Sequence, residues 1–112
     1  MMKFVINTHS VVDVITNSST EIFVCNTDKS IEVVEQCLRA MLSVYNSENG
    51  YAQLFEDVFT SIRIANEDDI EWYSDCVLEM QNTSIIIEPA DDWFPRSLSD
   101  AIVREFNAQI VM

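Results

Sequence analysis

Thr83-Ser84-Ile85-Ile86-Ile87-Glu88 is the stretch that decides the fold of this 112-residue chain. Its consecutive isoleucines leave neither side of a strand polar, which is typical of a strand buried on both faces. Pro89 follows and ends the strand, because proline has no backbone N–H to donate to a neighbour. The stretch therefore predicts a strand over 83–88 at the centre of a sheet.

Three further strands and one helix are predicted around this centre. Residues 3–8 and 20–26 are short, apolar and β-branched, and residues 109–112 form a short last strand. Ser97, with Asp100 three residues later, predicts the N-cap of a helix over 98–106. Residues 10–16 fit either a strand or a short helical turn, because β-branched residues follow Ser10, itself a good helix cap.

Three helices are predicted between the second strand and the central one. The clearest runs from Asp28 or Ser30 to Tyr45, because apolar residues recur at three- and four-residue steps. A second is predicted over 52–62 on the same spacing. Asn66 and Asp69 predict a capping box for a third over 67–80. The inward positions are Ile31, Val34, Leu38, Met41, Leu42 and Tyr45, then Leu54, Phe55, Val58, Phe59 and Ile62, then Ile70, Tyr73, Val77 and Met80.

These elements predict one domain, residues 1–112, of the α+β or α/β class. The expected order is ββαααβαβ, with a mixed sheet of about four strands covered mainly on one face by three or four helices. Apolar residues make up 48% of the chain, which disordered acidic chains lack. The expectation is a folded acidic domain, not an acidic tail.

The charge of the chain is concentrated in residues 48–92, which are called the acidic band below. The acidic band holds twelve carboxylates and one base, Arg63, and so contributes −11 of the chain's −13. Such a field repels nucleic acid and anionic membranes and attracts basic surfaces. We therefore expect neither direct nucleic-acid binding nor membrane binding.

Four carboxylates line one stripe of the third predicted helix, at Asp68, Glu71, Asp75 and Glu79. Trp72 borders that stripe and lies off the apolar face, so it is a candidate anchor for a partner. A solvated face that keeps the protein soluble is the alternative, with Trp72 packed under a loop. Trp93-Phe94-Pro95 is a second candidate aromatic site, or a cover for the sheet edge. Acid clusters at 67–69 and 91–92 match no calcium loop, so we expect no metal and no cofactor.

The polar N-terminal segment offers a different hypothesis, a small-ligand or nucleotide pocket or a hydrolase site. Its candidate residues are His9, Ser10, Asn17, Ser18, Ser19 and Glu21, with Asp13 nearby. Proximity of such residues in sequence does not establish a triad, which is defined by geometry. Hydrogen bonding of these side chains to the backbone of a turn is the alternative.

Residues 9–24, from His9-Ser10-Val11-Val12-Asp13 through Thr16-Asn17-Ser18-Ser19-Thr20-Glu21 to Val24, resemble the opening of small uncharacterised bacteriophage proteins. The resemblance brings no known activity. It implies a small acidic phage protein of the kind that binds and blocks a host protein.

The leading hypothesis is therefore a non-enzymatic, phage-encoded protein in the host cytoplasm. It would cover a basic, nucleic-acid-handling surface of a host or defence protein, acting as a nucleic-acid mimic. A self-assembling structural protein is a further alternative. The cysteines, Cys25, Cys37 and Cys76, fit neither a zinc site nor a redox pair and are expected to be reduced, mostly buried thiols.

Overall fold

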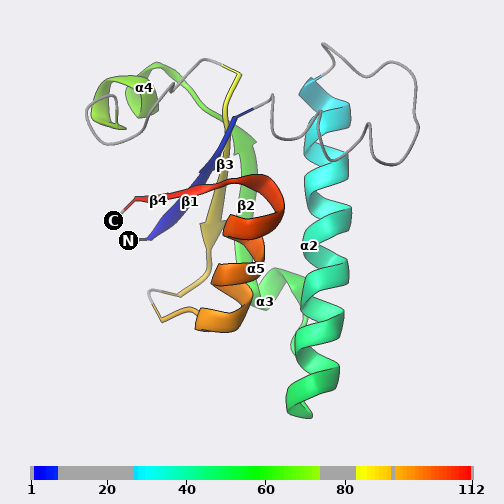
Figure 1. Cartoon of the computed structure of the whole chain (residues 1–112). Helices are drawn as coiled ribbons and strands as arrows, with labels where there is room; N and C mark the ends of the chain where they lie inside the picture. The colour runs from blue at the N-terminus through cyan, green and yellow to red at the C-terminus, as the bar shows by residue number, and fades with distance from the viewer. Residues whose placement is uncertain (1, 8–26, 74–82, 92, 112) are drawn as a thin grey trace.

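The computed structural model describes residues 2–7, 27–73, 83–91 and 93–111, and it has the expected α+β architecture (Figure 1). The strands are β1 (Lys3–Ile6), β2 (Phe59–Ile64), β3 (Ile85–Pro89) and β4 (Gln109–Val111). The helices are α2 (Thr27–Asn49), α3 (Phe55–Val58), α4 (Glu67–Tyr73) and α5 (Arg96–Phe106). The strand order is β2-β3-β1-β4.

β3 is an inner strand, as its isoleucines predict. It pairs with β1 on one side and β2 on the other, so that Ile87 lies between Phe4 and Ile62. The side chains of Ile85, Ile86 and Ile87 are all fully buried. Three consecutive isoleucines are stable in β3 because both faces of the strand are covered, with Ile85 and Ile87 in one core and Ile86 in the other.

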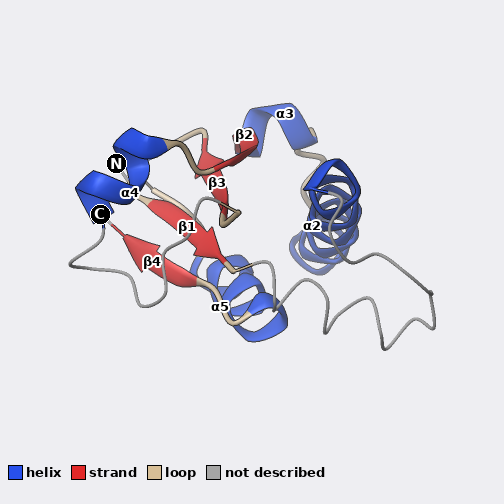
Figure 2. Ribbon diagram, turned by 90° about the horizontal axis from the view of Figure 1, so that it is seen from above, coloured by secondary structure: helices blue, strands red, loops and turns tan. Residues whose placement is uncertain are grey.

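The sheet has a helical layer on one face and a smaller cover on the other. Figure 2 shows α2 and α5 on one side of the strands and α4 on the opposite side. The larger core joins the sheet to the helical layer, and its central members include Phe4, Ile87, Leu38 and Ile102. The smaller core joins Val5 and Ile86 to Ala65, Tyr73 and Val111.

α2 confirms the predicted amphipathic helix, although it extends four residues beyond Tyr45. Val34, Leu38 and Leu42 are buried against the sheet. The other side of the helix is polar and exposed, which is the pattern of a surface helix. Accordingly, none of the helices in the described ranges is long and apolar enough to cross a membrane.

β2 corrects the predicted helix over 52–62. Only Phe55–Val58 is helical, Leu54 is 58% exposed, and Phe59–Ile64 forms an edge strand. The register shifts between Phe59 and Ser61, so Thr60 is an extra residue opposite β3. The bulge turns Phe59 and Ile62 to the same face three residues apart. That spacing imitates one turn of a helix, which is why the periodicity was misleading.

Several smaller expectations are also corrected. All described strand pairs are antiparallel, so the sheet is not mixed, and the described order is βααβαβαβ. Pro95, not Ser97, is the N-cap of α5 and makes no side-chain capping bond. Asn107 then ends α5 in the left-handed conformation, φ 51°, and leads directly into β4.

Three predicted elements fall partly or wholly outside the described residues. The strand expected over 20–26 lies wholly outside them, as does the strand or short helical turn expected over 10–16. α4 begins at Glu67 as predicted, but positions 74–80 of the expected third helix also lie outside them.

Candidate functional site

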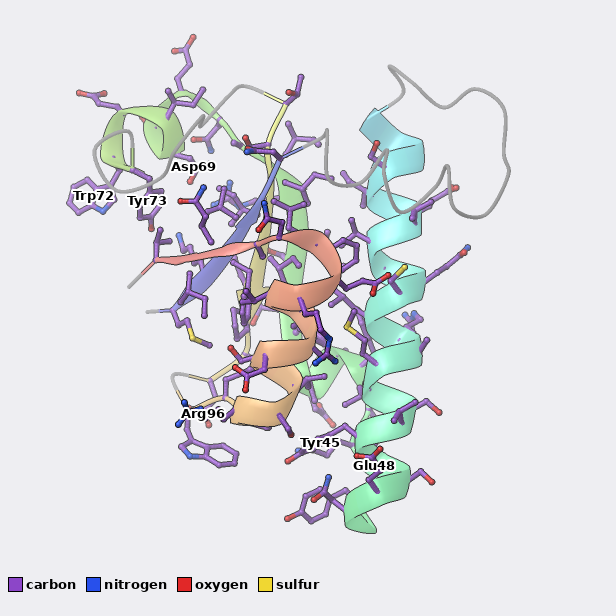
Figure 3. All side chains as sticks on the ribbon, in the orientation of Figure 1. Tyr45, Glu48, Asp69, Trp72, Tyr73 and Arg96 are labelled. Carbon is purple, nitrogen blue, oxygen red and sulfur yellow. The ribbon has the colours of Figure 1, made fainter. Side chains whose placement is uncertain are left out.

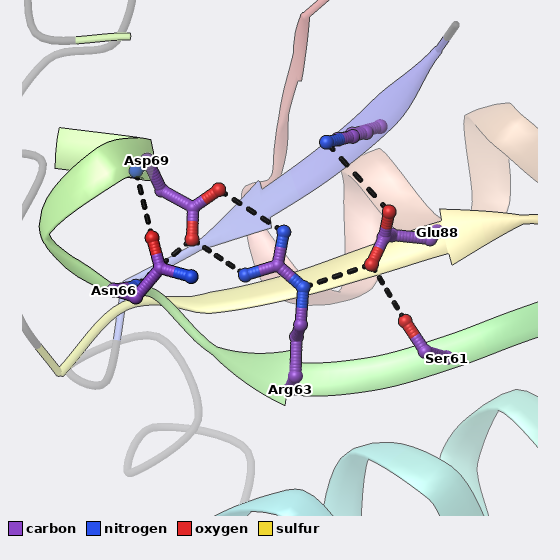
Figure 4. A network of polar contacts seen from close by, with 6 residues as sticks. Ser61, Arg63, Asn66, Asp69 and Glu88 are labelled. Atoms are coloured by element: carbon purple, nitrogen blue, oxygen red, sulfur yellow. Dashed lines mark hydrogen bonds and ion pairs between the residues drawn. The ribbon is translucent and has the colours of Figure 1, made fainter. Parts of the chain in front are cut away.

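Arg63, the only base of the acidic band, lies at the centre of an ion-pair network on the α4 side of the sheet (Figure 4). Its Nε donates to Glu88 Oε1 at 2.8 Å. Its two terminal nitrogens donate to the two carboxylate oxygens of Asp69, Nη2 to Oδ1 at 3.0 Å and Nη1 to Oδ2. This fork geometry is the strong form of a charge-assisted contact.

Neighbouring groups complete the network. Ser61 Oγ donates to Glu88 Oε1 at 2.7 Å, and Lys3 Nζ lies 3.6 Å from Glu88 Oε2. Asn66 N donates to Asp69 Oδ2 at 2.8 Å, while Asp69 N donates to Asn66 Oδ1 at 2.9 Å. The predicted capping box is therefore present, and its aspartate also binds the arginine.

The network shifts the pKa of each carboxyl group downward. The hydrogen bond from Arg63 lowers the pKa of Asp69, and it outweighs the effect of burial. Burial raises the pKa of Glu88, but hydrogen bonds from Arg63 and Ser61 together reverse that effect and leave it lowered. The pKa of Arg63 is raised, chiefly by its hydrogen bond to Asp69. All three groups stay charged at neutral pH.

The network has a structural role. Lys3 and Arg63 balance Asp69 and Glu88 in charge, and together they connect β1, β2, β3 and the start of α4. Within the described ranges, every buried side-chain nitrogen and oxygen has a hydrogen-bond partner.

The predicted partner-binding residues that the structure describes lie together on the outer side of α4. Asp68 and Glu71 are exposed, Trp72 is 78% exposed, and the three line one shallow hollow. Figure 3 shows Trp72 pointing away from the sheet, whereas Tyr73 points inward. Trp72 is thus not packed under any loop in the described part of the chain. Asp75 and Glu79 lie outside the described residues.

The described carboxylates of the acidic band separate into two groups. Asp69 and Glu88 are held in the network. The remaining described members are exposed at Glu48, Glu56, Asp57, Glu67, Asp68, Glu71 and Asp91. Arg63 is the only base of the acidic band, and it is engaged by Asp69 and Glu88.

Trp93 and Phe94 of the Trp93-Phe94-Pro95 segment lie in different surroundings. Phe94 packs with its ring centroid 5.5 Å from Phe4 and 5.7 Å from Phe59, so it belongs to the core. Trp93 is 72% exposed and lines a surface hollow with Tyr45 and Tyr51. The sequence indicated the exposed tryptophan, but it did not indicate the tyrosines that lie beside it.

The alternative ligand pocket falls outside the described residues in full: His9, Ser10, Asn17, Ser18, Ser19 and Glu21. Among the residues described, no group of three or more His, Cys, Asp or Glu is placed to hold a metal ion. Cys37 is a free, half-buried thiol, while Cys25 and Cys76 lie outside the described residues. Burial, and then the charge of Glu105, raise the pKa of Cys37, which disfavours the reactive thiolate.

Comparison with known proteins gives no further guide to the function. The chain matches no protein-family model, no curated protein and no solved structure. Its function is therefore inferred from the surfaces described above.

Proposed function

We propose that this chain is a non-enzymatic binding protein that covers a basic, nucleic-acid-handling surface of another protein. One observation carries the proposal: the only base of the acidic band is engaged in ion pairs with Asp69 and Glu88, while most of the band's described carboxylates are exposed. A basic partner would supply the countercharge that the band itself lacks.

The outer side of α4 supplies the proposed contact. Asp68 and Glu71 provide charge, and Trp72 provides an apolar anchor of a type enriched in interface cores. Residues three or four positions apart on a helix, such as Asp68 and Glu71, lie about 6 Å apart on its surface. This distance is comparable to the spacing of phosphates along a nucleic-acid strand. The face is therefore suited to occupy a surface that otherwise binds nucleic acid.

The resemblance of residues 9–24 to small bacteriophage proteins favours a bacterial host protein, such as a defence effector, as the target. Electrostatic steering would make association fast and sensitive to salt. The proposal includes no catalytic step and no cofactor.

A pull-down from bacterial lysate with matched charge-reversal variants tests the proposal. Asp68→Lys/Glu71→Lys alters the proposed face, whereas Glu56→Lys/Asp57→Lys makes the same change of net charge on α3. We expect a nucleic-acid-binding protein to be retained at about 50 mM salt and released at about 500 mM. The α4 double variant should lose it and the α3 double variant should keep it.

The retained protein is then assayed for binding to duplex DNA or RNA with and without this chain. Inhibition by the wild-type chain, but not by the α4 double variant, supports the proposal. Equal retention by both double variants, or nucleic-acid binding that the chain does not inhibit, would contradict it.

A further inference from the structure

Exposed apolar side chains gather at one end of the helical layer, away from α4. Six large apolar residues are exposed in the described part of the chain. Four of them, Val44, Tyr51, Leu54 and Trp93, lie on the last turns of α2, the connection to α3, or the connection from β3 to α5. Clustering of this kind marks an interaction surface more often than scattered exposure does.

A groove runs between α2 and α5 toward this cluster. It has a volume of about 650 Å³, and Met41, Val44, Leu98 and Ala101 are among its apolar lining. It follows α2 from Cys37 to Glu48, which is about 16 Å at 1.5 Å per residue. The groove is thus long enough for about three turns of a partner helix, in the manner of helix-in-groove recognition.

An aromatic hollow continues the groove at the end of α2. Tyr45 lines both spaces, and Tyr51 and Trp93 complete the hollow. The centroids of the Tyr45 and Tyr51 rings lie 5.9 Å apart and the rings are tilted by 46°. In Figure 3, Tyr45 points from α2 toward the α5 side, and Glu48 lies on the next turn.

The backbone that carries Tyr51 is fixed by hydrogen bonds before any partner binds. Asn46 Nδ2 donates to Gln53 O at 3.0 Å, and Gln53 N donates back to Asn46 Oδ1 at 3.3 Å. Tyr51 N donates to Asn46 O at 2.9 Å, and Gly50 between them adopts φ 69°. A preformed hollow costs less ordering entropy on binding than a mobile loop does.

The charges around the groove select the kind of partner. Glu48, Asp100 and Glu105 line it, against one base, Arg104. A second copy of this chain would bring the same excess of acid, which like-charge repulsion disfavours.

We infer that the α2–α5 groove and the Tyr45–Tyr51–Trp93 hollow together bind a basic, amphipathic helical segment of a protein. Apolar side chains of the segment enter the groove, and a Lys or Arg side chain enters the aromatic hollow beside Glu48. This inference rests on the proposed function, a basic protein partner, and adds a second contact surface to α4.

The two tryptophans of the chain allow the surfaces to be tested separately. In Trp72→Phe the remaining indole, Trp93, reports the hollow; in Trp93→Phe the remaining Trp72 reports α4. The probe is a synthetic amphipathic Leu/Lys helix of about 18 residues, roughly 27 Å long. A scrambled peptide of identical composition is the control for charge alone.

Groove occupancy is tested with Val44→Lys and a matched control, Ser43→Lys. Both residues are exposed on α2, but Val44 lines the groove and Ser43 does not. We expect the amphipathic peptide to shift the emission of Trp93, with binding at least about tenfold weaker in Val44→Lys, a change of about 1.4 kcal/mol. Ser43→Lys should bind within about twofold of the wild type, a difference under about 0.5 kcal/mol.

Three results would overturn the inference: emission shifts confined to Trp72, equal binding of the scrambled peptide, or equal loss of binding in Val44→Lys and Ser43→Lys. A shift confined to Trp72 would leave the α4 proposal standing. The converse pattern, a Trp93 shift with retention unchanged by Asp68→Lys/Glu71→Lys in the pull-down, would support the groove and contradict the α4 face.

Discussion

Arg63 on β2 donates its Nε hydrogen to Glu88 Oε1 on β3 at 2.8 Å, which engages the only base of the acidic band in a partly buried ion pair. The same guanidinium binds Asp69, whose side chain is only 8% exposed. This pairing determines both how the sheet is joined to α4 and why the outer surface remains acidic.

Replacing Arg63 by Met should lower the free energy of unfolding by about 2–4 kcal/mol, because Asp69 would be left buried without its cation and Glu88 would keep only Lys3. Arg39→Met is the matched control. Arg39 pairs with Glu35 at about half exposure, so its loss should cost less than about 1 kcal/mol. Urea unfolding of the three proteins measures the difference, and equal losses would contradict a structural role for the network.

The stability contributed by the network should disappear in acid. The folded-state pKa values of Asp69 and Glu88 are lowered from their ordinary values of 3.8 and 4.5. Groups with lowered pKa values stabilise the fold at pH above the unfolded values, and this stabilisation is lost as pH falls through the folded values. The wild type should therefore exceed Arg63→Met in free energy of unfolding by a constant amount from about pH 7 to about 5. This difference should become smaller below about pH 4.5.

Urea titrations of both proteins at a series of pH values check this dependence. Using the difference between the proteins removes the general relief of self-repulsion that occurs when exposed carboxylates are protonated. If the difference in free energy of unfolding stayed constant down to about pH 3, the pKa values of Asp69 and Glu88 would not depend on Arg63.

Asn66→Ala should destabilise the start of α4 and cost about 1 kcal/mol, because the Asp69 N–H would lose the side-chain oxygen that accepts it. Asn66→Ser retains a good capping oxygen and is expected to cost only a few tenths of a kcal/mol. Thermal unfolding followed by circular dichroism compares the two. If serine and alanine proved equally damaging, the effect would not come from the cap.

Cys37 should react slowly with iodoacetamide at about pH 8, because its raised pKa leaves little thiolate. The experiment uses a protein in which Cys25 and Cys76 are replaced by Ser, with reaction followed by mass spectrometry. Glu105→Gln removes the charge that contributes to the raised pKa and should accelerate the reaction modestly. Labelling as fast as that of free cysteine would contradict a half-buried thiol.

Much of the framework was predictable from local sequence. The 3.6-residue spacing from Ile31 to Tyr45 identified α2, the isoleucines identified an inner strand, and Asn66 with Asp69 identified the start of α4. Each of these signals depends on residues within a few positions of one another, which is the range over which propensity and capping act.

β2 was not predictable by the same means. Thr60 forms a bulge only in the pairing of β2 with β3, and that bulge places Phe59 and Ile62 on one face. The spacing of the apolar residues is identical to that of a helix, so only the partner strand distinguishes the two structures.

The sequence by itself determined the class of the fold, the inner strand and the strong acidity of residues 48–92. Tertiary structure alone decided which carboxylates of that band face outward and which are held by Arg63. It also brought Trp93 to one hollow with Tyr45 and Tyr51, which lie more than 40 positions earlier in the chain. The physical reason is that net charge and apolar spacing can be read from the order of residues along the chain. The Arg63–Glu88 ion pair and the place of Trp93 in the hollow depend instead on contacts that form only when the chain folds.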